Sequence, residues 1–134
     1  MTLSEEVKDI GTPEIWRLEP LIDVLAYFAA ARNYGYVDAL TNALDPATAL
    51  EAMVNAIRDF KSTCIDRRPS SEEAICPTID LGKLEKSARY FEEVVSSLGG
   101  TGDLVLLVRR IALRALARSH KYRPGSGGAS EDLA

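Results

Sequence analysis

Hydrophobic residues along this chain recur every three to four positions, which is the spacing of one face of an α-helix. Leu21, Leu25 and Phe28 begin the first such stripe. The four long stripes lie in residues 20–32, 46–61, 81–98 and 101–122. Runs of β-branched residues bounded by turns are scarce by comparison. The pattern therefore predicts an all-α protein, a helical bundle of four main helices plus one or two short ones.

Prolines and acidic residues mark where the helices are expected to begin. Asp45 followed by Pro46 has the form of an N-cap and a first helical residue. Asp80 stands in the same position before the third long stripe. Pro20 would break a helix interior, so residues 15–18 are expected to form a separate turn before the first main helix.

Glycines mark the predicted helix ends. Gly99 and Gly100 follow the third stripe and are expected to stop it. Gly35 follows the first stripe, and we expect it to adopt the left-handed conformation that glycine tolerates best. A short helix is then expected up to Leu44.

Residues 62–79 interrupt the helical pattern with two prolines and both cysteines, and we interpret them as a long irregular loop or small insertion. Ser70 and Glu73 match a capping box, which would allow one helical turn there. A disulfide between Cys64 and Cys76 is geometrically possible. Two unrelated thiols are the more common outcome in a reducing cytosol, whereas a hyperthermophilic source would favour the bridge. The sequence leaves this question open.

The length of 134 residues suits one domain with a single core, and we assign residues 1–123 to it. Residues 124–134 are rich in glycine and serine with an acidic end, which predicts a disordered tail. No run of about 18 uncharged apolar residues occurs. The acidic N-terminus lacks the features of a secretory signal, so a cytoplasmic location is expected.

The charge is unevenly distributed along the chain. Residues 1–100 hold 17 acidic and 10 basic side chains, a net charge of −7. Residues 101–123 hold six basic side chains and one acidic one, a net charge of +5. The net charge of −4 excludes a protein that covers nucleic acid with a uniformly basic surface. One predicted helix is nevertheless strongly basic.

Four cations of that helix fall on one side of it. At about 100° per residue they lie between about 100° and 180° from Arg109, at successive turns roughly 6 Å apart. They are Arg110, Arg114, Arg118 and Lys121. Such a stripe is the candidate nucleic-acid-binding site, because its spacing is comparable to that of phosphates along an extended strand.

Two other interpretations of this stripe remain open. Basic residues near a helix C-terminus interact favourably with the helix dipole. The stripe could also pair with acidic residues on neighbouring helices, which is the more common outcome for such charge runs.

Features that would support catalysis or metal binding are missing from the sequence. The chain has one histidine, His120, and two cysteines, too few for most nucleophilic or zinc sites. The glycine-rich stretch at residues 99–102 lacks the Gly-Lys-Ser/Thr ending of a phosphate-binding loop. We therefore expect no enzymatic activity, no metal, no cofactor and no small-molecule substrate.

A resemblance to a known family is carried by residues 34–44, which read YGYVDALTNAL, together with Asp45-Pro46 and the helix through Phe60. These residues resemble the small-subunit family of archaeal type I-A CRISPR interference (Cascade) complexes, most clearly over residues 21–61. The resemblance implies a non-catalytic α-helical protein that lies along the guide-RNA-bearing filament and helps hold opened target DNA. It transfers no binding residue to this chain.

Two functional hypotheses follow. In the first, the chain is a subunit of such a complex and contacts phosphates of guide RNA or target DNA through the basic stripe. Its partners would be other subunits and copies of itself, with no membrane. In the second, it is a structural helical adaptor that assembles through apolar surfaces without touching nucleic acid.

Overall fold

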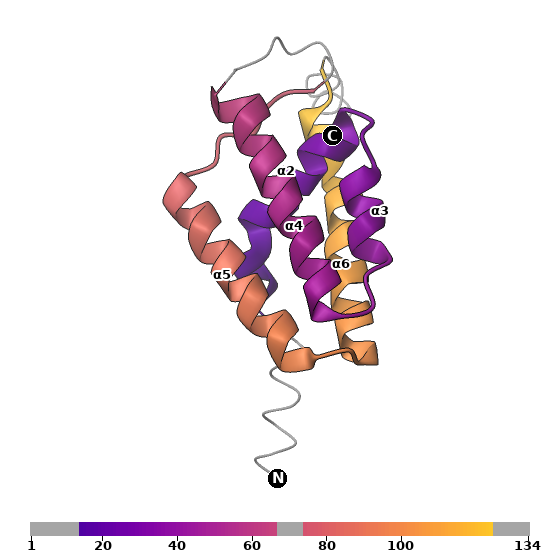
Figure 1. Cartoon of the computed structure of the whole chain (residues 1–134). Helices are drawn as coiled ribbons and strands as arrows, with labels where there is room; N and C mark the ends of the chain where they lie inside the picture. The colour runs from indigo at the N-terminus through magenta and orange to yellow at the C-terminus, as the bar shows by residue number, and fades with distance from the viewer. Residues whose placement is uncertain (1–13, 67–73, 125–134) are drawn as a thin grey trace.

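The computed structural model describes residues 14–66 and 74–124, and every regular element in these ranges is helical (Figure 1). The α-helices are α2 (Glu19–Ala30), α3 (Gly35–Thr41), α4 (Pro46–Phe60), α5 (Leu81–Leu98) and α6 (Gly102–Arg118). The remaining helical turns are η1 (Ile15–Leu18), η2 (Lys61–Asp66) and η3 (Ser119–Tyr122). The prediction of an all-α bundle with four main helices and a short one is confirmed.

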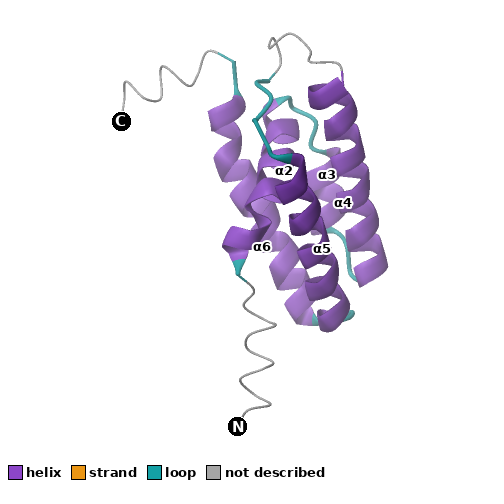
Figure 2. Cartoon of the chain, turned by 90° about the vertical axis from the view of Figure 1, so that its left-hand side faces the viewer, coloured by secondary structure: helices purple, strands orange, loops and turns teal. Residues whose placement is uncertain are grey.

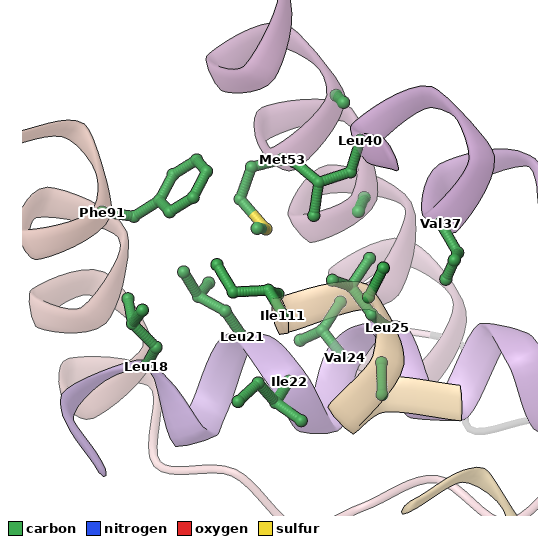
Figure 3. Packing of buried hydrophobic residues seen from close by; sticks show 14 of the residues in the cluster. Leu18, Leu21, Ile22, Val24, Leu25, Val37, Leu40, Met53, Phe91 and Ile111 are labelled. Atoms are coloured by element: carbon green, nitrogen blue, oxygen red, sulfur yellow. The ribbon is translucent and has the colours of Figure 1, made fainter. Parts of the chain in front are cut away.

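Helix α2 forms the centre of the bundle and packs against α4, α5 and α6. From Leu21 to Ala30 every side chain of α2 except that of Asp23 is buried. A helix that is apolar on all sides is stable only when other elements surround it. Leu21 meets Met53, Phe91 and Ile111, so that each of the four main helices contributes to one hydrophobic cluster (Figure 3).

The predicted helix starts are confirmed. The Asp45 carboxylate accepts a hydrogen bond from the Thr48 backbone N–H at 2.8 Å, and this bond lowers the pKa of Asp45. The Asp80 carboxylate accepts two, from the backbone N–H groups of Gly82 at 2.7 Å and Lys83 at 3.2 Å. Each carboxylate satisfies donors that have no partner inside the helix.

The end of α2 differs from the prediction. Arg32, not Gly35, adopts the left-handed conformation, with φ of 65°, and Gly35 is the first residue of α3. The Asn33 N–H donates to the Phe28 carbonyl at 2.8 Å and the Arg32 N–H to the Ala29 carbonyl at 3.0 Å. This is a Schellman motif that is usually built on glycine. The other predicted stop is confirmed, because Gly99 ends α5 with φ of 61°.

The segment predicted to be irregular at residues 62–79 is more ordered than expected. Helix α4 continues as the π-helical segment η2 as far as Asp66, whereas residues 74–80 have no regular secondary structure. Residues 67–73, which include the predicted capping box, lie outside the described residues. Cys64 and Cys76 are joined by a disulfide with a Cα–Cα distance of 5.7 Å, so of the two alternatives that the sequence left open, the bridge is the one formed, and not the two unrelated thiols expected in a reducing cytosol.

The bridged segment is also attached to the C-terminal end of the fold. The Ile75 N–H donates a hydrogen bond of 2.6 Å to the Tyr122 carbonyl in η3. Apart from Pro124, the tail expected at residues 124–134 lies outside the described residues. Among the described helices, none is long and apolar enough to cross a membrane.

Candidate nucleic-acid interface

Helix α6 carries three residues of the predicted basic stripe, and the fourth, Lys121, follows it in η3. Helix α6 lies on the side of α2 that faces away from α4 (Figures 1 and 2). Its buried side packs on α2 and α3. That side consists of Leu104, Leu107, Val108, Ile111, Ala112 and Ala115. These residues cover less than half of the helix circumference, so α6 presents a broad outer surface to solvent.

Three of the four predicted site residues are exposed, two on this outer surface and one in η3. Arg110, Arg114 and Lys121 are exposed. None of the three forms a hydrogen bond or ion pair with any residue in the part of the chain that the structure describes. We call these three residues the exposed stripe. Their charged groups are hydrated and available to an anionic partner.

The fourth predicted residue, Arg118, is separated from the exposed stripe. Its guanidinium forms ion pairs with Glu19 and, at 3.0 Å, with Asp23, both on α2. The hydrogen bond with Glu19 is the main reason that the pKa of Arg118 is raised. For this residue the structure agrees with the alternative that the stripe pairs with neighbouring acidic groups, and we assign Arg118 a role in stability.

Tyr122 adds a third group to this polar cluster. Its hydroxyl donates a hydrogen bond of 3.0 Å to the Asp23 carboxylate, the same oxygen that Arg118 contacts. Burial is the main cause that raises the pKa of Tyr122 to about 12, and the charge of Asp23 adds to it. Asp23, the one side chain of α2 between Leu21 and Ala30 that is not buried, thus holds the end of α6 and η3 against the core.

The apolar residues on the outer surface of α6 were not predicted from the sequence. Leu106 and Leu113 are 65% and 66% exposed, and Leu116 is 39% exposed. Their spacing of seven and three residues is that of a helix-pairing seam, and this signal was present in the sequence. The buried face of α6 already accounts for the apolar periodicity of this helix, so the second strip does not stand out in the pattern.

Other surface features offer less to a ligand. Tyr36, Asn55, Arg58, Asp59 and Ser62 line a polar hollow of about 510 Å³. Within it the Tyr36 hydroxyl donates to Asp59 at 2.6 Å, and this bond raises the pKa of Tyr36 to about 12. Over residues 14–66 and 74–124, no three His, Cys, Asp or Glu side chains lie close enough to hold a metal ion.

Comparison of the chain with protein-family models, with curated proteins and with solved structures gave no match.

Proposed function

We propose that this chain is a non-catalytic helical subunit of a nucleoprotein complex that contacts phosphates through the exposed stripe. The observation that carries the proposal is a row of three exposed cations, Arg110, Arg114 and Lys121, on a protein whose net charge is −4. The resemblance carried by residues 34–60 favours a CRISPR interference complex as the assembly. Its other subunits and the guide RNA or target DNA would then be the partners.

The arrangement of charge supports localised contact with a strand of nucleic acid. Arg110 and Arg114 are one helical turn, about 6 Å, apart along α6. Each phosphate neutralised by a cation releases counterions, so the binding constant falls as the salt concentration rises. For single strands, the slope of log K against log salt concentration (the salt slope) is about −0.7 per contact. Three contacts predict a salt slope of about −2 and an affinity that falls roughly 20-fold between 50 and 200 mM salt.

The acidic remainder of the chain restricts where a strand can bind. Residues 1–100 carry a net charge of −7 and repel phosphates, so a strand would approach α6 rather than the opposite side of the bundle. Such a subunit would act in the cytoplasm. The disulfide is compatible with this location in hyperthermophiles, whose intracellular proteins are rich in disulfides.

Charge reversal on α6 and η3 tests the proposal. The triple variant Arg110→Glu, Arg114→Glu and Lys121→Glu should abolish binding to a fluorescently labelled single-stranded oligonucleotide, measured by anisotropy between 50 and 200 mM salt. All three side chains are exposed, so the variant should keep its helical circular dichroism.

A matched control on α5 separates a local contact from the effect of total charge. Lys83, Lys86 and Arg89 are exposed cations on a different helix, and reversing them changes the net charge by the same amount. This control should retain most of the affinity and the salt slope of the unaltered chain. Equal losses in the two triple variants would contradict a contact specific to α6.

A second candidate function is favoured by the exposed leucines of α6. A structural adaptor would use Leu106, Leu113 and Leu116 to bind protein and would need no phosphate contact. Absence of oligonucleotide binding by the unaltered, folded chain at 50 mM salt would favour this adaptor over the nucleic-acid-binding subunit.

A further inference from the structure

The Cys64–Cys76 disulfide lies at the end of the bundle where α6 passes into η3. In Figure 1 the end of η2, residues 74–80 and the yellow η3 lie together at the top of the molecule. Cys64 belongs to the π-helical η2, and Cys76 to the segment 74–80 that has no regular secondary structure. The bridge therefore joins two parts of the chain that are not α-helical.

The bridge also fixes a hydrogen bond to η3. The Ile75 backbone N–H donates to the Tyr122 carbonyl at 2.6 Å. Ile75 directly precedes Cys76, so the disulfide holds this N–H in place at the end of α4. We call the disulfide together with this hydrogen bond the C-terminal latch.

The turn η3 has few other attachments. It consists of four residues, too few to be stable through its own hydrogen bonds. It packs against α2, and the Tyr122 hydroxyl donates to Asp23 at 3.0 Å. Lys121, the last cation of the exposed stripe, lies in this turn. The position of Lys121 relative to Arg110 and Arg114 therefore depends on how firmly η3 is held.

The core of the bundle does not depend on the latch. Residues of the four main helices, such as Leu21 and Phe91, make up most of the hydrophobic cluster (Figure 3). Cys64 and Ala74 are the buried members that η2 and residues 74–80 add to it, and both side chains are small. Opening the bridge therefore removes little packing.

An external dithiol can open the bridge. The chain has two cysteines and both are in the bridge, so no third thiol of the chain can attack it. Cys64 is buried and Cys76 is only partly buried, so attack is directed to Cys76. Disulfides in the cytosol of mesophiles are usually transient and redox-responsive, and the cytoplasm proposed above contains dithiol reductants.

The exchange proceeds in two steps. One thiolate of the reductant bonds to Cys76 Sγ, and the bond between the two cysteine sulfurs breaks with Cys64 leaving as a thiolate. The second thiol of the reductant then displaces Cys76. Two electrons and two protons pass to the protein, so that Cys64 and Cys76 end as thiols and the reductant ends as a disulfide.

We propose that the C-terminal latch is a redox switch. When the bridge is closed, it holds Ile75 against Tyr122 and fixes η3. When a dithiol opens it, residues 74–76 and η3 are released while the helical bundle stays folded. The latch goes beyond the proposed function, whereas its effect on Lys121 as a phosphate contact rests on that function.

Limited trypsin digestion with mass spectrometry tests the latch without nucleic acid. Trypsin does not cleave before proline, which excludes Arg123, so Lys121 is the cleavage site in η3. The chain is reduced with dithiothreitol, which is removed without air before digestion. Reduction should speed cleavage after Lys121 at least about fivefold, the value of one backbone hydrogen bond. Cleavage after Arg110 and Arg114, within α6, should not change, and the helical circular dichroism should be retained.

Three variants separate the parts of the latch. Cys76→Ser should be cleaved after Lys121 as fast as the reduced chain, whether or not dithiothreitol has been used. Ile75→Pro removes the N–H donor but keeps both cysteines, and it should release η3 with the bridge closed. Ile75→Ala keeps the donor and is the matched control, which should respond to reduction as the unaltered chain does.

Several results would overturn the latch. One is equal cleavage after Lys121 in the oxidised and reduced chains. Another is loss of helical circular dichroism on reduction, or a parallel rise in cleavage after Arg110 and Arg114, because the bridge would then hold the whole bundle. A further gain on reducing Ile75→Pro would refute the hydrogen bond as the connection to η3.

Binding of a single-stranded oligonucleotide tests the effect on Lys121. With two fixed contacts in place of three, the salt slope of the reduced chain should change from about −2 to about −1.4, and the affinity at 50 mM salt should fall by up to about eightfold. An unchanged slope together with faster cleavage after Lys121 would refute the effect on phosphate binding. If the oxidised chain binds no oligonucleotide, the proposed function fails, and the trypsin result alone decides the latch.

Discussion

Arg32 occupies a backbone conformation that costs stability, and replacing it with glycine should stabilise the protein. Its φ of 65° lies in the left-handed region, where the β-carbon of an L-residue crowds the following carbonyl. The hydrogen bonds of the Schellman motif at this position are made by backbone groups alone, so a glycine preserves them. The Arg32 side chain is exposed, and its removal should leave no cavity.

The size of the effect follows from two opposing contributions. Relief of the left-handed strain is worth about 1–2 kcal/mol per residue. Glycine also increases the conformational entropy of the unfolded chain, which offsets about 0.5–1 kcal/mol. The variant Arg32→Gly should therefore unfold with a free energy about 0.5–1 kcal/mol higher, which for a chain of this length raises Tm by about 3 °C.

Urea denaturation monitored by circular dichroism measures the difference, with the midpoint shifting at constant slope. The matched control is Arg32→Ala, which removes the same long side chain but keeps the β-carbon and its strain. Its midpoint should stay close to that of the unaltered protein. A glycine variant no more stable than the alanine variant would refute the reasoning, because the strain would then not be the cause.

Three further predictions concern other parts of the fold. Asp80→Ala removes the α5 cap and should lower the free energy of unfolding, measured by urea titration, by about 1 kcal/mol. Asp80→Asn can still cap the helix and should keep most of that stabilisation. Reducing the Cys64–Cys76 disulfide, whose partners are 12 positions apart, should lower that free energy by about 3 kcal/mol in titrations with and without a dithiol. The pKa of Tyr122 is raised from its ordinary value of 10 to about 12, so folding favours the neutral phenol over the phenolate. The contribution of Tyr122 to the free energy of unfolding is therefore complete below pH 10 and is lost as the pH rises towards 12. Tyr122→Phe loses the hydrogen bond to Asp23 and should be less stable at pH 8, with a difference from the unaltered protein that shrinks above pH 10.

Much of the architecture could be predicted because the signals are local. The apolar stripes and the carboxylates at Asp45 and Asp80 act within one or two turns of their own helix, and the structure confirms the elements they predict. Gly35 shows where local reasoning fails. Glycine was expected to end α2, but the helix ends at Ala30 and the left-handed position falls on Arg32, three residues before Gly35.

The candidate site was only partly predictable because it depends on contacts between distant residues. Helical geometry placed Arg118 on the same side as Arg110 and Arg114, yet only folding brings it to Glu19 and Asp23, more than 90 positions away along the chain. Proximity of Cys64 and Cys76 likewise depends on how residues 74–80 return to the end of α4. Periodicity on one helix cannot supply this information.

The enclosure of α2 has a consequence for how the protein can change over time. Because α2 is surrounded by α4, α5 and α6, the helix that contributes most to the core presents almost no surface to a partner. Any recognition chemistry must therefore be carried by the outer surfaces of the surrounding helices, where substitutions do not disturb the packing. Stability and recognition are thus assigned to separate sets of residues, and the outer surface can diverge to suit a new partner while the folded scaffold stays the same.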